Sequence, residues 1–150
     1  LTGMGDRSDT FMAGLAIQAV LPGGFEVSAS YEYDVLDRIG GSEARVAVDK
    51  SLQFGVFRFA PEIAINWTGS QLSNHDFGVA ENESTIERPA YTLDDTYSVE
   101  AGVGMFIEIT RDWLIFMNVA AESLGDEVTA SPIVSEDYVI KGFAAINYVF

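Results

Sequence analysis

The most regular feature of this chain is a two-residue alternation of apolar and polar side chains, clearest between residues 25 and 35. There, apolar or aromatic residues occupy every odd position, and Glu, Ser or Asp occupies every even one. Successive side chains of a β-strand point to opposite faces, so a period of two predicts a strand with one apolar face. The stretch is also about as long as a tilted strand that crosses a bilayer.

Six further stretches show this alternation, in some cases with less contrast. They cover residues 10–20, 44–52, 57–68, 97–109, 113–122 and 138–150. Pro61 lies inside one of them, and because proline has no N–H to donate, we expect a bulge or a missing hydrogen bond there. The last stretch carries Tyr138 near one end of its apolar face and Tyr148 and Phe150 at the other, which is typical of the closing strand of an outer-membrane barrel.

The segments between the seven predicted strands differ in length in a regular way. Those on the side of the C-terminus are short, and they lie at residues 21–24, near Gly55 and at 110–112. Those on the opposite side tend to be longer, and they lie around Gly40 and Gly41, from Gly69 to Asp95 and at 124–137. Outer-membrane barrels have short periplasmic turns and long extracellular loops.

We therefore expect a single all-β domain over residues 1–150, an antiparallel up-and-down transmembrane β-barrel. The structural alternative is a soluble ligand-binding barrel whose apolar faces point inward. Bacterial single-chain barrels have even numbers of strands, and an open edge in hydrocarbon leaves backbone groups unpaired. Seven strands therefore predict an N-terminally truncated barrel that lacks an odd number of strands upstream.

Composition narrows the range of functions. The chain has 23 acidic and 8 basic residues, a formal net charge of −15, and no cysteine. This balance argues against binding to nucleic acid, because few cations are present to neutralise phosphates. The absence of cysteine excludes disulfides, thiolate metal sites and cysteine nucleophiles. No apolar run is long enough for a transmembrane helix.

One short segment places three chemically useful side chains together. Ser73, His75 and Asp76 combine a hydroxyl, an imidazole and a carboxylate within four residues. A lipid-modifying outer-membrane hydrolase is one interpretation, but a triad requires a particular geometry, which neighbours on one loop rarely form. A metal site at His75 and Asp76 needs further ligands. We therefore assign no catalytic, cofactor-binding or metal-binding residues, and interpret the segment as the polar start of a loop.

The predicted inner face carries many carboxylates. They are Glu26, Glu32, Asp34, Glu62, Glu100, Glu108 and Glu122. They either line a small cation-preferring pore or pair with Arg45, Arg58 and Lys141 inside a filled lumen. A second acidic group lies in the longest loop, where solvated carboxylates are the default and divalent cations bridging lipopolysaccharide are the alternative. It comprises Asp76, Glu81, Glu83, Glu87, Asp94 and Asp95.

Several segments, taken in order, resemble one protein family. They are GMGDR at 3–7, Tyr33-Asp34-Val35 with Gly40-Gly41, NHDFGV at 74–79, residues 97–109 followed by Trp113, SPIV at 131–134 and GFAAINYVF at 142–150. Together they are similar to the MipA/OmpV family of MltA-interacting outer-membrane proteins. One departure is that Asp76 precedes Phe77, where the family pattern has an aromatic residue.

The resemblance implies a non-enzymatic barrel of ten to twelve strands, of which this chain is the C-terminal part. It implies a scaffold that links a lytic transglycosylase and a murein synthase to the outer membrane; other family members are described as osmoregulated or adhesion-associated. It further implies contact with outer-membrane lipids and lipopolysaccharide. Finally, it implies recognition of Tyr148 and Phe150 by the barrel assembly machinery.

Overall fold

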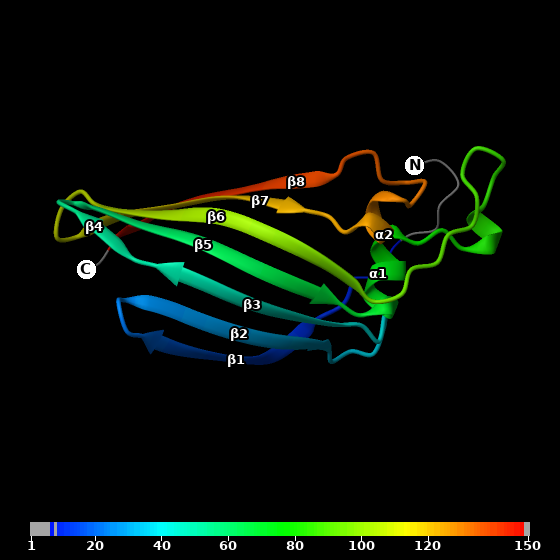
Figure 1. The fold of residues 1–150 in the computed structure, drawn as a ribbon, viewed down its shortest axis with the longest axis horizontal. Helices are drawn as coiled ribbons and strands as arrows, with labels where there is room; N and C mark the ends of the chain where they lie inside the picture. The colour runs from blue at the N-terminus through cyan, green and yellow to red at the C-terminus, as the bar shows by residue number, and fades with distance from the viewer. Residues whose placement is uncertain (1–6, 8, 149–150) are drawn as a thin grey trace.

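A single antiparallel sheet forms nearly the whole of the structure (Figure 1). The computed structural model describes Arg7 and residues 9–148. The strands are β1 (Met12–Leu21), β2 (Phe25–Asp34), β3 (Ser42–Lys50), β4 (Leu52–Phe54), β5 (Phe57–Thr68), β6 (Thr96–Glu108), β7 (Trp113–Ser123) and β8 (Tyr138–Tyr148). Each long strand pairs with its neighbour in sequence, in the order β1-β2-β3-β5-β6-β7-β8. This is the predicted all-β, up-and-down arrangement, and within the described residues the sheet does not close on itself.

The interruption predicted at Pro61 is present, although it takes only one of the two expected forms. Asp49 of β3 pairs with Glu62, and Leu52 of β4 pairs with Phe59. The number of residues between the two pairs is the same on both strands, so no residue is inserted and a bulge is wrong. Pairing simply stops opposite Pro61, which has no N–H to donate. The predicted strand over 44–52 is therefore two pieces, β3 and the three-residue β4.

The short turns and the long connections lie at opposite ends of the sheet, as predicted (Figure 1). Gly23 and Gly24, with φ of 88° and 75°, form the turn between β1 and β2, and Gly24 N–H donates to Leu21 O at 3.2 Å. These dihedrals favour glycine because it lacks a Cβ. We call this end, with its turns at 22–24, 55–56 and 109–112, the turn end. The other end carries the connections 35–41, 69–95 and 124–137, and we call it the loop end.

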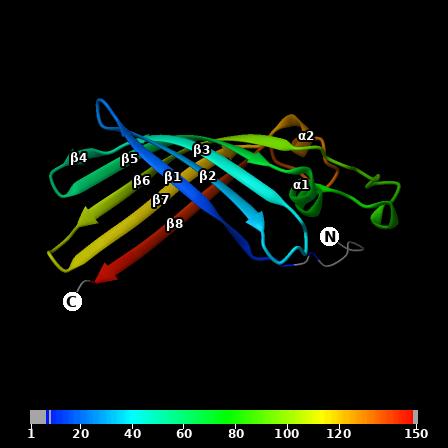
Figure 2. The same cartoon turned by 90° about the horizontal axis from the view of Figure 1, so that it is seen from below.

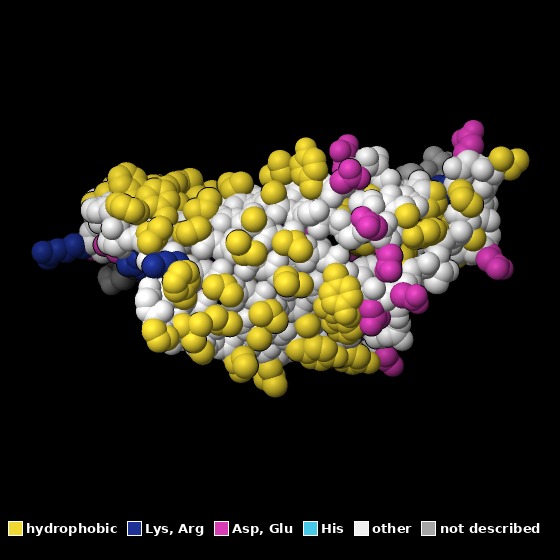
Figure 3. Space-filling model, in the orientation of Figure 1, with side chains coloured by type: hydrophobic (Ala, Val, Ile, Leu, Met, Phe, Trp, Pro, Cys, Tyr) yellow, Lys and Arg dark blue, Asp and Glu magenta, His cyan; other side chains and the backbone are white. Residues whose placement is uncertain are grey.

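The two faces of the sheet differ sharply in polarity. Cross-strand register aligns Ile17, Ala29, Val46, Ile65 and Val99 on one face. Large apolar side chains on this face are exposed, for example Ile17 at 74% and Ile63 at 63%. Figure 3 shows hydrophobic side chains spread over the strands, with acidic side chains gathered at the loop end. A continuous exposed apolar surface of this kind is a lipid-facing surface, and we call it the outer face.

Aromatic residues mark both borders of the outer face. On β8, Tyr138 and Tyr148 are ten positions apart, as are Trp67 and Phe57 on β5. Ten residues of strand extend about 33 Å. At a tilt of about 40°, this length gives an apolar band of about 25 Å between two aromatic girdles, the height found in outer-membrane barrels. The alternative of a soluble barrel with inward apolar faces is therefore wrong.

The longest connection is more ordered than its sequence indicated. Residues 69–95 contain helix α1 (Ser70–Phe77), the 3₁₀ turn η1 (Glu81–Glu83) and a bridge between Val79 and Tyr91. A second short helix, α2 (Asp126–Thr129), lies between β7 and β8. Both helices sit at the loop end, beside each other (Figures 1 and 2). No helix in the described part of the chain has the length and apolar character needed to cross a membrane.

Candidate functional site

A network of charged side chains crosses the face opposite the lipid-facing one, which we call the inner face. Arg45 on β3 forms ion pairs with Glu62 and Glu100, the latter at 2.9 Å. Lys141 on β8 pairs with Glu100 at 3.0 Å and also with Glu122. Glu100 thus bridges two cations, and its side chain is only 10% exposed. Of the two interpretations of the inner carboxylates, pairing with Arg45 and Lys141 is therefore the one that the structure shows for these three.

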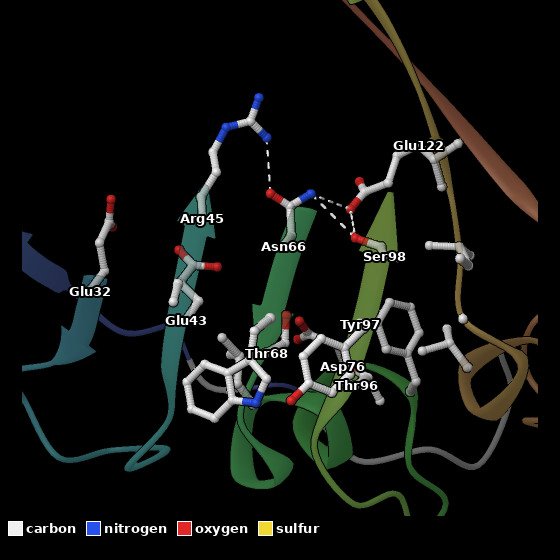
Figure 4. Close-up of a pocket in the computed structure, with 18 of the residues that line it drawn as sticks. Glu32, Glu43, Arg45, Asn66, Thr68, Asp76, Thr96, Tyr97, Ser98 and Glu122 are labelled. Atoms are coloured by element: carbon white, nitrogen blue, oxygen red, sulfur yellow. Dashed lines mark hydrogen bonds between the residues drawn. The ribbon is translucent and has the colours of Figure 1, made fainter. Parts of the chain in front are cut away.

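Two neutral residues, Asn66 and Ser98, connect Arg45 to Glu122 (Figure 4). Arg45 Nη1 donates to Asn66 Oδ1 at 2.9 Å, and Asn66 Nδ2 donates to Glu122 Oε1 at 3.0 Å. Ser98 Oγ also donates to Glu122. Hydrogen bonds and ion pairs therefore tie β3, β5, β6, β7 and β8 together on the inner face. Because each charge has partners, the cost of removing it from bulk water is offset.

Arg58, the third cation predicted for the inner face, lies outside the network of ion pairs. Arg58 approaches Glu108 at 3.8 Å near the turn end, where both side chains are exposed. Exposed pairs of this kind contribute little to stability. Next to them the inner face is apolar, because Phe116 packs against Phe106 at 4.6 Å and Phe143 at 5.9 Å between ring centroids. Aromatic side chains therefore cover the inner face at this end, where they would fill part of a small lumen.

The carboxylates of β2 and β3 stand outside the network. Glu32 and Glu43 lie directly opposite each other in the register of β2 and β3, and neither forms an ion pair within the described residues. Like charges placed opposite each other destabilise a strand pair. Glu26, by contrast, accepts a hydrogen bond from Gln18 Nε2 at 2.6 Å. The acidic character predicted for the inner face is therefore left uncompensated mainly along β2 and β3.

Asp34 has a role that the alternation did not reveal. Although it was grouped with the lumen-lining acids, it is fully buried at the end of β2. Its carboxylate accepts hydrogen bonds from the backbone N–H groups of Leu36, Ile39 and Gly40 at 2.7 to 3.0 Å. Thr10 Oγ1 donates to the same carboxylate. Asp34 therefore organises the connection between β2 and β3 and does not line a pore, and it forms no ion pair with any residue that the structure describes.

A pocket of about 430 Å³ lies at the loop end of the inner face (Figure 4). Its wall is made of strand residues that include Arg45, Asn66 and Ser98, and α1 and α2 contribute further lining residues. The strand residues contributed from inner-face positions are Ser30, Glu32, Glu43, Arg45, Asn66, Thr68, Thr96, Ser98, Glu122, Val139 and Lys141. The pocket therefore occupies the space between the polar face of the sheet and the two helices.

The structure does not bring Ser73 and His75 together. Ser73 is fully buried in α1, and its Oγ lies 2.8 Å from Thr96 Oγ1 and 3.2 Å from Thr68 O. His75 Nδ1 instead lies 2.8 Å from Asp76 Oδ1. A nucleophile needs a hydrogen bond to its base, and this pair has none. Ser73 is thus a structural residue that fixes α1 to the ends of β5 and β6.

The acidic residues of the long loop form no metal-binding group in the structure. Among the described residues, no set of three or more His, Asp or Glu side chains is arranged to hold a metal ion. Glu83 lies near Arg7 at 4.0 Å, and Asp95 Oδ1 accepts a hydrogen bond from Ser70 N–H at 2.9 Å. The carboxylate of Asp95 therefore satisfies a backbone donor at the start of α1.

Comparison with known proteins adds an independent observation. The family model described as "MltA-interacting protein MipA" matches residues 2–150. The chain is 30% identical over 132 residues to the outer membrane protein OmpV of Vibrio cholerae and to the outer membrane protein Omp26La of Vibrio anguillarum, covering 88% of this chain and 51% of each relative. It is 25% identical over 146 residues to the MltA-interacting protein of Escherichia coli, covering 97% of this chain and 58% of that relative. The chain thus spans about half the length of these relatives, and no solved structure matches it.

Proposed function

This chain belongs to the MipA family of MltA-interacting proteins, and from that premise we propose that it is part of a non-enzymatic scaffold for peptidoglycan-remodelling enzymes. It is an outer-membrane protein, as its OmpV-type relatives and its lipid-facing outer face show. The observation that carries the scaffold proposal is the name of the Escherichia coli relative, MltA-interacting protein. By that likeness, we propose that this chain binds a murein transglycosylase. A murein synthase is the second proposed member of the same assembly.

The turn end is the surface that we assign to these partners. In outer-membrane barrels, short turns face the periplasm, where peptidoglycan lies. Three short connections meet that side, at residues 22–24, 55–56 and 109–112. Figure 3 shows basic side chains at this end and acidic ones at the other. Arg111 is an exposed residue of the last of these turns and provides a defined point of contact.

The inner face supports a scaffold better than an enzyme or an open channel. Ser73 and His75 are held apart by different hydrogen-bond partners. Glu62, Glu100 and Glu122 are paired with Arg45 or Lys141 and so are not free to attract cations. The apolar outer face supplies the contacts with lipid and lipopolysaccharide that a membrane-anchored scaffold requires.

Site-specific photo-cross-linking in native membranes tests the proposal. A cross-linker placed at Arg111 of the full-length protein should capture a lytic transglycosylase and a murein synthase. The matched control is a cross-linker at Ile86, a fully exposed residue of the loop end. Capture from position 111 but not from position 86 is the expected result. Equal capture from both, or no more capture than from an unrelated barrel, contradicts the proposal.

A further inference from the structure

Helix α1 is the point where the connections of the loop end meet. Within its own connection, Ser73 is hydrogen-bonded to Thr68 and Thr96, and Asn74 makes two hydrogen bonds to Leu93. The latter run from Asn74 Nδ2 to Leu93 O at 2.6 Å and from Leu93 N–H to Asn74 Oδ1 at 2.8 Å. Leu93 is itself buried. The two halves of the longest connection are thus fastened to each other and to the ends of β5 and β6.

The other two long connections are fastened to the same region. Gly41, at the end of the connection between β2 and β3, lies so close to α1 that a Cβ there would come within 2.7 Å of Leu72 Cβ. From the connection between β7 and β8, Ser131 Oγ donates to Phe77 O at 2.6 Å. Tyr91 OH likewise donates to Glu127 O at 2.7 Å. Neighbours from three separate connections therefore hold α1 in one position.

Helices α1 and α2 both lie on the inner-face side of the sheet. Leu72, Asp76 and Phe77 of α1 line the pocket opposite the inner-face residues Glu43 and Arg45. Gly125 and Val128, beside and within α2, line the same pocket, and Val128 is only 3% exposed. Both helices therefore stand over the polar face, at the place where a barrel lumen opens to the exterior.

We propose that α1 and α2 form a fixed plug across the extracellular mouth of the lumen, so that the protein is closed to ions and to small solutes. The plug is held by side-chain hydrogen bonds from Asn74 and Ser131 and by the close packing of Gly41 on Leu72. The paired charges beneath it, from Arg45 to Lys141, fill part of the space that a channel would need. This inference does not depend on the scaffold role.

Cysteine accessibility in intact cells tests the plug directly. In full-length protein with no other cysteine, Ser98→Cys places a thiol on the inner face under the plug, and Ile86→Cys places one on the exposed loop. A membrane-impermeant maleimide should label Ile86→Cys and leave Ser98→Cys unlabelled. The combined change Asn74→Ala and Ser131→Ala removes the fastening hydrogen bonds, and labelling of Ser98→Cys should then rise about tenfold.

The matched control is Asn82→Ala with Ser84→Ala. These are the same types of substitution, at exposed residues of the connection that contains α1, and the Ser84 hydroxyl bonds to Glu81 O rather than to α1. This control should leave labelling at Ser98→Cys unchanged, and heat-modifiable migration reports that each barrel is folded. In planar bilayers, the parent protein should show no steady conductance. Labelling of Ser98→Cys as fast as Ile86→Cys without the fastening changes, or steady conductance of the parent protein, overturns the plug.

Discussion

At the residue scale, single side chains determine how the strands are joined at the loop end and across the inner face. The alternation placed the acids and cations on one face and left open whether the acids line a pore or pair with the cations, and Arg45, Glu100 and Lys141 are paired. Which acid pairs with which cation depends on the register between strands, and the alternation along one strand does not specify that register. Asp34 occupies the same face of its strand as the other inner-face acids, but it lies at the end of the strand. There its carboxylate accepts hydrogen bonds from backbone N–H groups of the following loop. The role of Asp34 therefore depends on the conformation of the loop, which the two-residue alternation of side chains does not predict.

Replacing Asp34 with Ala should loosen the connection between β2 and β3. The change leaves the N–H groups of Leu36, Ile39 and Gly40 without their acceptor. Arg38 is exposed in this connection, so trypsin added to intact cells should cleave after it faster than in the parent protein. Asp94→Ala, at an exposed residue of another loop, should leave the cleavage rate unchanged. An unaltered rate for Asp34→Ala would show that the carboxylate is not needed for loop order.

Replacing Glu100 with Gln should destabilise the folded barrel. The buried carboxylate holds Arg45 and Lys141, and a neutral amide supports neither cation equally well. We expect the free energy of unfolding in urea to fall by roughly 1 to 3 kcal/mol. Glu108→Gln removes only an exposed pair at 3.8 Å and should cost less than about 1 kcal/mol. The hypothesis fails if both variants unfold at the same urea concentration.

At the element scale, strands were predictable and the helix was not. Alternation is a local property, because each side chain of a lipid-facing strand meets either lipid or the lumen. The predicted strands therefore agree with β1 to β8 apart from the break that separates β4 from β3. Helix α1 has weak amphipathic character, since its polar residues Ser73 and Asn74 face other protein groups through hydrogen bonds. Such contacts come from segments remote in sequence, so local pattern cannot reveal them.

The break opposite Pro61 gives a test of how much one missing donor matters. Pro61→Val restores an N–H at a position whose side chain lies on the outer face, where valine is compatible with lipid. The regained hydrogen bond toward Lys50 should raise the free energy of unfolding by about 1 kcal/mol. Pro22→Val, in the turn between β1 and β2, should bring no gain because the rigid ring favours that turn. Equal or lower stability of Pro61→Val would locate the cause of the break elsewhere.

At the scale of the whole molecule, the two ends of the sheet differ in loop length and in charge. One end has short turns and exposed basic residues, the middle has an apolar outer face between aromatic girdles, and the other end has acidic loops and two helices (Figures 1 and 3). Loop lengths alone predicted this orientation. The family resemblance added the partners, which no residue pattern of this chain specifies, and those partners stay proposals.

The end of the last strand should direct assembly into the outer membrane. Tyr148 packs on Trp113, with ring centroids 4.8 Å apart, and Phe150 lies outside the described residues. We propose that the barrel assembly machinery recognises these two aromatics. Deleting Phe150 should lower the amount of heat-modifiable protein in the outer membrane, whereas Phe54→Ala, an exposed aromatic of the same end, should not. Normal yield of the deletion variant would count against this role.

The opposed carboxylates Glu32 and Glu43 also determine where water is found. Neither forms an ion pair in the described part of the chain, so hydration must help to stabilise both charges. Around Phe116, by contrast, the rings of Phe106 and Phe143 pack against its ring and offer water no hydrogen-bond partner of their own. The interior side of this sheet is therefore most in need of water along β2 and β3, and least where Phe106, Phe116 and Phe143 pack together. Solvent dipoles, which reorient freely, complete the electrostatics along β2 and β3, whereas the fixed cations Arg45 and Lys141 do so for the carboxylates of β5, β6 and β7.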